Sequence, residues 1–238
     1  MLKAAIEKIL DLGKTEVKEI NGQTYSNKSL YRINHNPKAE RIYMNTLSSL
    51  IDYIKADVDK MQGKMIIHVV SPTEVRMYSE LDADRERECV VEVNAQLPDF
   101  RFNNYTDHEA FCINLQSKFI DNTDRKLLLK FAGTVEAGSV AEYGDDGITQ
   151  KATVKKGITS KEDAIVPNPV SLVAYRTFLE VDQPNTEFIF RMKQDKYEGI
   201  QCGLFEADGG AWKLQAMNNI KMYLEAELED VDGFIVIS

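Results

Sequence analysis

The segment 201–228 restricts the fold most, because it combines a turn signal with a change of hydrophobic period. Two short apolar runs flank Asp208-Gly209-Gly210, a combination that allows positive φ angles in a tight hairpin turn. Apolar residues then alternate with polar ones, which predicts a strand containing Trp212, Leu214 and Ala216. The period next becomes helical, with Asn218 or Asn219 as the expected N-cap and one face formed by Ile220, Tyr223, Leu224 and Leu228. The segment predicts a structure and contains no pattern specific to a reaction.

The rest of the chain predicts an α+β fold. Helical spacing of apolar residues predicts helices within residues 1–13, 45–58 (capped by Asn45 or Thr46 and stopped at Gly63) and 107–119. Apolar runs, and alternation at 74–81, predict strands near 65–70, 74–81, 89–93, 127–131, 174–179, 187–192, 201–205 and 234–237. Turn residues predict hairpins at Asn21-Gly22 and within 138–157. This order predicts antiparallel sheets with helices packed on one face. Each domain of a processivity clamp has the same order, so a clamp-like arrangement is an alternative.

A candidate linker divides the chain into two regions. Residues 159–169 include Pro167 and Pro169 and few large apolar side chains. We therefore expect an N-terminal α+β region at 1–158 and a C-terminal α+β region at 170–238. The two regions either form sub-domains or pack together as one domain.

Composition indicates a folded cytosolic protein with reduced thiols. Of 238 residues, 43% are hydrophobic and 28% are charged, and the formal net charge of −9 disfavours nucleic acid and anionic membranes as general partners. No apolar run approaches the ~18–20 residues that span a bilayer, and charges within the N-terminal apolar pattern predict a helix rather than a signal peptide. Three widely spaced cysteines (Cys89, Cys112 and Cys202) predict reduced thiols.

The motifs of common enzyme classes are absent from the sequence. It contains no phosphate-binding loop, dinucleotide fingerprint or nucleophile elbow. Asp107-His108-Glu109 is better explained as an acidic helix start than as a metal site, and Cys112 has no recognisable base. Neighbouring carboxylates are expected to be solvated: Asp82 and Asp84, Asp145 and Asp146, and Glu229, Asp230 and Asp232. We therefore expect no catalytic residue, metal or cofactor, and no enzymatic activity.

One concentration of positive charge accompanies the 138–157 hairpin. Lys151, Lys155 and Lys156, followed by Lys161, could form an anion site with Arg125 and Lys126. The alternative interpretation is a solvated edge strand that lysines protect from further pairing.

Two C-terminal stretches carry a family resemblance: residues 175–184, with Glu187-Phe188 close behind, and residues 204–212. Together with residues 50–54 they resemble the YfdQ-like family of phage and prophage proteins, a domain of unknown function. Leu179 stands where the family pattern has proline. The resemblance implies a temperate-phage or prophage gene expressed in a bacterial cytoplasm, and such genes commonly serve phage DNA metabolism or interference with host defence. It transfers no catalytic role to any residue.

The residues of these stretches allow two interpretations. Arg176 forms either a structural ion pair with Glu180, Asp182 or Glu187, or a phosphate or carboxylate site beside Tyr175 and Phe178. Trp212, the only tryptophan, either packs in the core or provides a stacking surface. The candidate ligand site therefore comprises Tyr175, Arg176, Phe178 and Trp212 with Lys151, Lys155 and Lys156.

Two functions follow from these observations. The first is a non-enzymatic, homo-oligomeric binding protein that captures a small anionic ligand or a host protein. The alternative is an accessory factor of phage DNA replication or recombination, either clamp-like or single-strand binding. Hydrolysis of a nucleotide signal is a third reading, for which the sequence offers no nucleophile or base.

Overall fold

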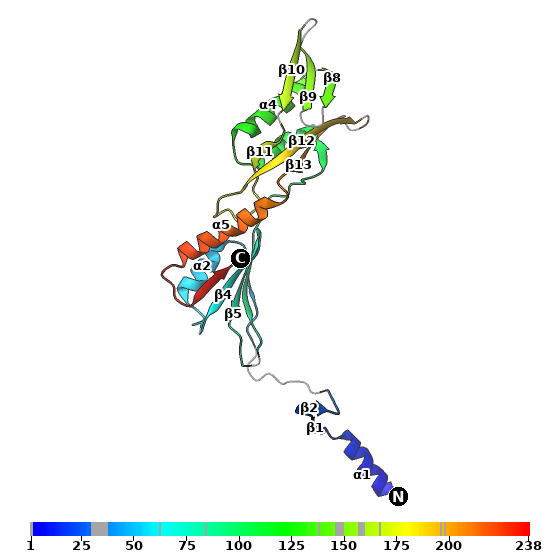
Figure 1. Ribbon diagram of the computed structural model, residues 1–238, viewed down its shortest axis with the longest axis vertical. Helices are drawn as coiled ribbons and strands as arrows, with labels where there is room; N and C mark the ends of the chain where they lie inside the picture. The colour runs from blue at the N-terminus through cyan, green and yellow to red at the C-terminus, as the bar shows by residue number, and fades with distance from the viewer. Residues whose placement is uncertain are drawn as a thin grey trace. The chain divides into compact units, whose positions relative to one another are not determined.

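A computed structural model describes residues 2–29, 38–61, 63–83, 85–137, 139–145, 150–156, 160–166, 168–195, 197 and 199–238 (Figure 1). For residues 2, 4, 12, 134–137, 139–145, 150–156, 160–166 and 195 it describes the backbone alone. The chain divides into two compact units, Met1–Ala39 and Glu40–Ser238.

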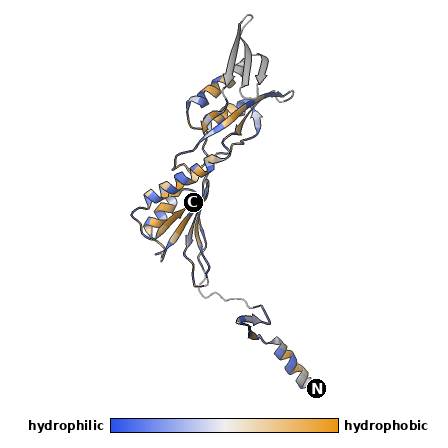
Figure 2. Cartoon of the chain, in the orientation of Figure 1, coloured by the Kyte–Doolittle hydropathy of each residue, from blue (hydrophilic) through white to orange (hydrophobic). Residues whose placement is uncertain are grey.

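The N-terminal unit consists of one helix and one hairpin. Helix α1 (Leu2–Gly13) precedes strands β1 (Val17–Ile20) and β2 (Gln23–Ser26), which pair antiparallel. Asn21 and Gly22 both have positive φ, as the predicted Asn-Gly turn requires. Figure 2 shows hydrophilic and hydrophobic residues interspersed along α1. Every side chain that is described between residues 3 and 29 is exposed.

The first sheet of the larger unit has the strand order β14-β4-β5-β6-β3. Its strands are β3 (Ile42–Met44), β4 (Met65–Ser71), β5 (Glu74–Ser79), β6 (Cys89–Asn94) and β14 (Phe234–Ile237). The pairs β4–β5 and β5–β6 are antiparallel as predicted, whereas β14 pairs parallel with β4, and β3 with β6. The sheet is therefore mixed.

Helices α2 (Leu47–Ala56) and α5 (Ala211–Glu227) cover one face of this sheet (Figure 1). Alternate strand residues point into a core with both helices, formed by Leu47, Leu50, Ile51, Ile54, Met65, Ile67, Val69, Val75, Met77, Val91, Val93, Phe178, Val181, Ile220, Leu224 and Leu228. Thr46 caps α2 as predicted, accepting a hydrogen bond from Ser49 N at 3.1 Å. The helix ends at Ala56, before Gly63, because Asp57 adopts a left-handed conformation.

The second sheet has the order β11-β12-β13-β7 and its own core. Its strands are β7 (Tyr105–Asp107), β11 (Val170–Val173), β12 (Asn185–Asp195) and β13 (Gly199–Glu206), and it packs with helices α3 (His108–Ser117) and α4 (Thr123–Ala137). The core comprises Phe111, Leu115, Phe119, Leu128, Phe131, Val170, Leu172, Ala174, Phe188, Phe190, Met192, Cys202 and Leu204.

A third sheet, β10-β9-β8, includes the predicted lysine-rich hairpin. Strands β8 (Ser139–Asp145) and β9 (Gln150–Lys156) pair antiparallel, with Asp145 opposite Gln150. Strand β10 (Ser160–Val166) pairs with β9, so the candidate linker 159–169 contains a sheet strand instead.

Three predicted elements differ from the structure. The run 127–131 lies in helix α4, where Leu128, Phe131 and Ala132 are buried at helical spacing; a short apolar run does not distinguish a buried strand from a helix. Residues 174–179 form a loop after β11, with one isolated bridge between Ala174 and Phe119.

The third difference concerns the start of α5. Asp208-Gly209-Gly210 leads from strand β13 into this helix, so it does not turn a hairpin, and the helix begins at Ala211 rather than near Asn218. Both glycines have positive φ, and the Asp208 carboxylate accepts hydrogen bonds from Gly210 N (3.0 Å) and Trp212 N (3.2 Å). These bonds satisfy backbone donors at the helix start.

Candidate functional site

Arg176 is the centre of a buried polar cluster, and its side chain is only 6% exposed. Its Cζ atom lies 4.0 Å from the ring centroids of both Phe102 and Trp212. Its Nη2 atom donates to Oε1 of Glu206, and Trp212 Nε1 donates to the same oxygen at 3.1 Å. Burial lowers the pKa of the Arg176 guanidinium from its usual value, and the Glu206 carboxylate acts against this decrease.

Gln183 determines the path of the backbone at Arg176. The Gln183 side-chain oxygen accepts hydrogen bonds from Arg176 N (2.8 Å) and Thr177 N (3.1 Å), and its amide donates to Phe178 O at 2.9 Å. The Thr177 hydroxyl donates to Pro72 O, in the turn between β4 and β5, at 2.5 Å. The loop 174–179, which follows β11 of the second sheet, is therefore hydrogen-bonded to the first sheet.

This geometry favours the structural interpretation of Arg176. Its partner is Glu206, at the end of β13, rather than Glu180, Asp182 or Glu187. Glu180 instead accepts hydrogen bonds from Ser48 N and Oγ at the start of α2 (3.3 and 3.4 Å). With its charge matched inside the fold and two rings against it, Arg176 is poorly placed to hold an external anion.

The other predicted ligand residues are only partly brought together. The structure places Arg176 and Trp212 in contact, but Phe178 packs in the core of the first sheet. Tyr175 is half-buried, and its backbone N donates to Lys118 O at 3.1 Å. The side chains of Lys151, Lys155 and Lys156 lie outside the described residues, so the DNA-binding alternative stays a prediction.

Arg125 and Lys126 have partners of their own. Arg125 donates to the carbonyl oxygens of Leu115 and Gln116, both at 2.8 Å, and so satisfies carbonyls near the end of α3. Lys126 forms an ion pair with Asp121 at 2.9 Å.

The start of α3 has the predicted acidic cap and a buried histidine. Asp107 accepts a hydrogen bond from Ala110 N at 2.8 Å. His108 Nε2 lies 3.0 Å from Ala132 O and 3.8 Å from Cys112 Sγ. Burial raises the pKa of the nearby Cys202 thiol to about 12, so this thiol stays protonated at neutral pH.

Metal-ligand clusters and membrane-spanning helices are both missing from the described residues. Within the described ranges, His, Cys, Asp and Glu side chains form no group of three or more that could hold a metal ion. No helix in the described part of the chain combines the length and apolar character required to cross a bilayer.

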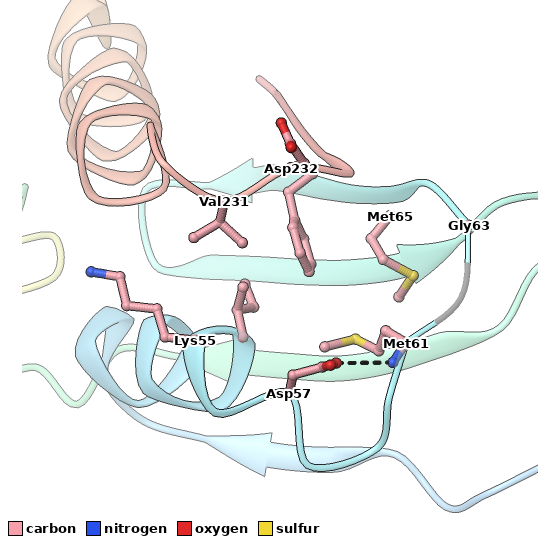
Figure 3. A pocket seen from close by; sticks show the side chains of 9 residues that line it. Lys55, Asp57, Met61, Gly63, Met65, Val231 and Asp232 are labelled. Atoms are coloured by element: carbon pink, nitrogen blue, oxygen red, sulfur yellow. Dashed lines mark hydrogen bonds between the residues drawn. The ribbon is translucent and has the colours of Figure 1, made fainter.

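A pocket of about 310 Å³ lies where α2 ends, β4 begins and the chain enters β14 (Figure 3). Its lining is mixed: Ile54, Met61, Met65, Val231 and Phe234 are apolar, and Lys55, Asp57 and Asp232 are charged. Asp57 accepts a hydrogen bond from Met61 N at 3.1 Å (Figure 3). Sequence patterns do not reveal this pocket, because its residues come from two distant parts of the chain, 54–65 and 231–234.

Comparison with protein-family models, curated proteins and solved structures finds no match for this chain. The resemblance to phage proteins, and the bacterial cytoplasm that it implies, therefore stay predictions.

Proposed function

We propose that this chain is a non-enzymatic binding protein that works as a homo-oligomer, with its N-terminal unit as the assembly element. The observation that supports this proposal most is the exposure of that unit. Ile6, Ile9 and Leu10 on α1 are 49%, 68% and 63% exposed, and Val17, Ile20 and Tyr25 of the hairpin are also exposed.

Physical arguments make such a unit dependent on a covering surface. A helix shorter than about 12–15 residues is marginal in water, and so is a lone two-stranded hairpin. Burial of one large aliphatic side chain contributes roughly 1.5–3 kcal/mol. Ile6, Ile9 and Leu10 share one side of α1, so docking of this side against another surface would stabilise the unit.

The captured target is a protein of the phage's bacterial host rather than a small anion. Of the residues predicted for an anion site, Arg176 has its charge met by Glu206 within the fold, and Lys126 is paired with Asp121. Capture of a host protein also agrees with the phage origin that the sequence resemblance implies.

The proposal is tested by sedimentation velocity of the full chain over a range of concentrations. The Ile9→Glu variant places a charge on the apolar side of α1 and is expected to sediment as a monomer where the unmodified chain associates. Leu179→Glu is the matched control, because Leu179 is 67% exposed in the larger unit, against 68% for Ile9. Equal association of the unmodified chain and Ile9→Glu would reject the N-terminal unit as the assembly element.

A further inference from the structure

The pocket beside β14 has the features of a docking site for an apolar helix. Five of its lining residues are apolar: Ile54 and Met65 are buried at its base, and Met61, Val231 and Phe234 are half-buried. Met61 has a flexible side chain that adapts to a partner surface. Strand β14 is the outer strand of its sheet, next to β4 alone in the described strand order. Ile235 and Ile237 on this strand are exposed, whereas Phe234 and Val236, which alternate with them, pack toward the core on the face that holds the pocket.

The charged residues around the pocket are mainly acidic. Asp57 and Asp232 line it and are exposed. The lining lysine, Lys55, has its Nζ atom 3.3 Å from Oε2 of Glu227, which offsets its charge. Glu229 and Asp230 precede the pocket residues Val231 and Asp232 and are also exposed.

The N-terminal unit has the opposite charge balance. Residues 1–39 contain seven Lys and Arg against four Asp and Glu, a formal net charge of +3. Residues 40–238 contain the other 22 Lys and Arg against 34 Asp and Glu, a net charge of −12. The N-terminal unit of one chain is thus attracted to the larger unit of another.

We propose that helix α1 of a second copy of this chain docks at this pocket. The side chains of Ile6, Ile9 and Leu10 enter the apolar lining, and Lys3 at the start of the helix lies toward the acidic rim at Asp57 and Asp232. This proposal rests on the proposed self-association and adds to it the surface on which helix α1 docks.

The test uses full-length variants that disable either the helix or the pocket. Ile9→Glu disables the helix, and Met61→Glu places a charge inside the pocket; each alone is expected to sediment as a monomer. A mixture of the two variants retains one intact helix and one intact pocket, so it is expected to regain association as a heterodimer. Leu214→Glu, an exposed apolar site on α5 outside this pocket, is the control and is expected to associate normally.

A charge exchange provides a second measurement that leaves the apolar contacts intact. Lys3→Glu and Asp232→Lys are each expected to weaken association about fivefold, and their combination in one chain to restore it, because the opposite charges meet again. Both residues are exposed, so folding should be retained, and circular dichroism checks this.

The possible failures are distinguishable. If Met61→Glu associates normally while Ile9→Glu does not, the N-terminal unit drives assembly but docks elsewhere, which overturns this inference and leaves the proposed function standing. If a folded Met61→Glu variant and the folded Ile9→Glu variant both associate as the unmodified chain does, both proposals fail. Failure of the mixed variants to associate would also overturn the inference.

Discussion

The Arg176 guanidinium lies 4.0 Å from the centroid of the Trp212 ring, and both side chains donate a hydrogen bond to the same oxygen of Glu206. Trp212 lies in the first turn of α5, the helix that packs in the core of the first sheet. Arg176 Cζ also lies 5.4 Å from the ring centroid of Phe188 in the other core. The Arg176–Glu206–Trp212 cluster therefore connects the two cores.

Removal of the Glu206 charge should destabilise the larger unit. Glu206→Gln leaves the buried Arg176 charge without its counter-ion, and we expect the free energy of unfolding in urea to fall by about 1–3 kcal/mol. Glu187→Gln, an exposed residue on β12, should change it by less than about 0.5 kcal/mol. A Glu206→Gln variant as stable as the unmodified chain would show that the ion pair contributes nothing.

The Gln183 side chain should contribute as much to the stability of the larger unit as the Arg176–Glu206 ion pair does. Gln183→Ala removes the acceptor of two backbone N–H groups and the donor to Phe178 O. Because these groups lie in a partly buried loop, we expect thermal unfolding to reveal a loss of about 1–3 kcal/mol. Gln194→Ala, at an exposed position on β12, is the control and should leave the melting temperature nearly unchanged. Equal melting temperatures for both variants would contradict the role assigned to Gln183.

Substitution by alanine should have opposite effects on stability at Gly203 and Gly133. A Cβ atom at Gly203 on β13 would lie 2.8 Å from the Asn104 carbonyl oxygen, closer than backbone packing permits, so Gly203→Ala should destabilise the fold. At Gly133 in α4 nothing lies within 4 Å of an added Cβ, and Gly133→Ala should stabilise the helix by up to about 1 kcal/mol. Urea denaturation of both variants measures the difference, and a stabilising Gly203→Ala would contradict the close approach of β7 to β13.

Stability should depend on pH through Glu92. A hydrogen bond from Asn94, together with Arg41 and Arg76, holds the pKa of Glu92 below its usual value. A group with a lowered folded pKa stabilises the fold above its unfolded pKa, and this contribution is lost as pH falls through the folded pKa. As the pH falls below about 4–5, near the usual glutamate pKa, the unmodified protein should therefore lose stability more steeply than the Glu92→Gln variant does. Identical pH profiles of the two proteins would refute this contribution.

The sequence predicts those parts of the fold that depend on local patterns. A continuous apolar run identified β4, alternation identified β5, and a short apolar segment identified β6. The Asn21-Gly22 turn identified the first hairpin, and Thr46 and Asp107 were correct as caps. The start of α5 was wrong because the alternation of Trp212, Leu214 and Ala216 imitates a strand, although Leu214 is 65% exposed. Gly209 and Gly210 have the positive φ angles that a hairpin turn can require, but in this chain they lead into helix α5.

The candidate sites depend on contacts that local patterns do not encode. The structure brings the predicted residues Arg176 and Trp212 into contact, but Glu206 was not identified as the counter-ion because it lies 30 residues from Arg176 in the sequence, on strand β13. The pocket joins residues near 55–65 with residues near 231–234, which come together only through the parallel pairing of β14 with β4. An amphipathic α1 was predicted, whereas the exposure of its apolar side required the structure.

The central claim is that the chain self-associates through its N-terminal unit, and native mass spectrometry of the full chain at micromolar concentration tests it most directly. The account predicts a dimer or a larger closed assembly for the unmodified protein and a monomer for Ile9→Glu. A monomer for the unmodified protein at every concentration would contradict it.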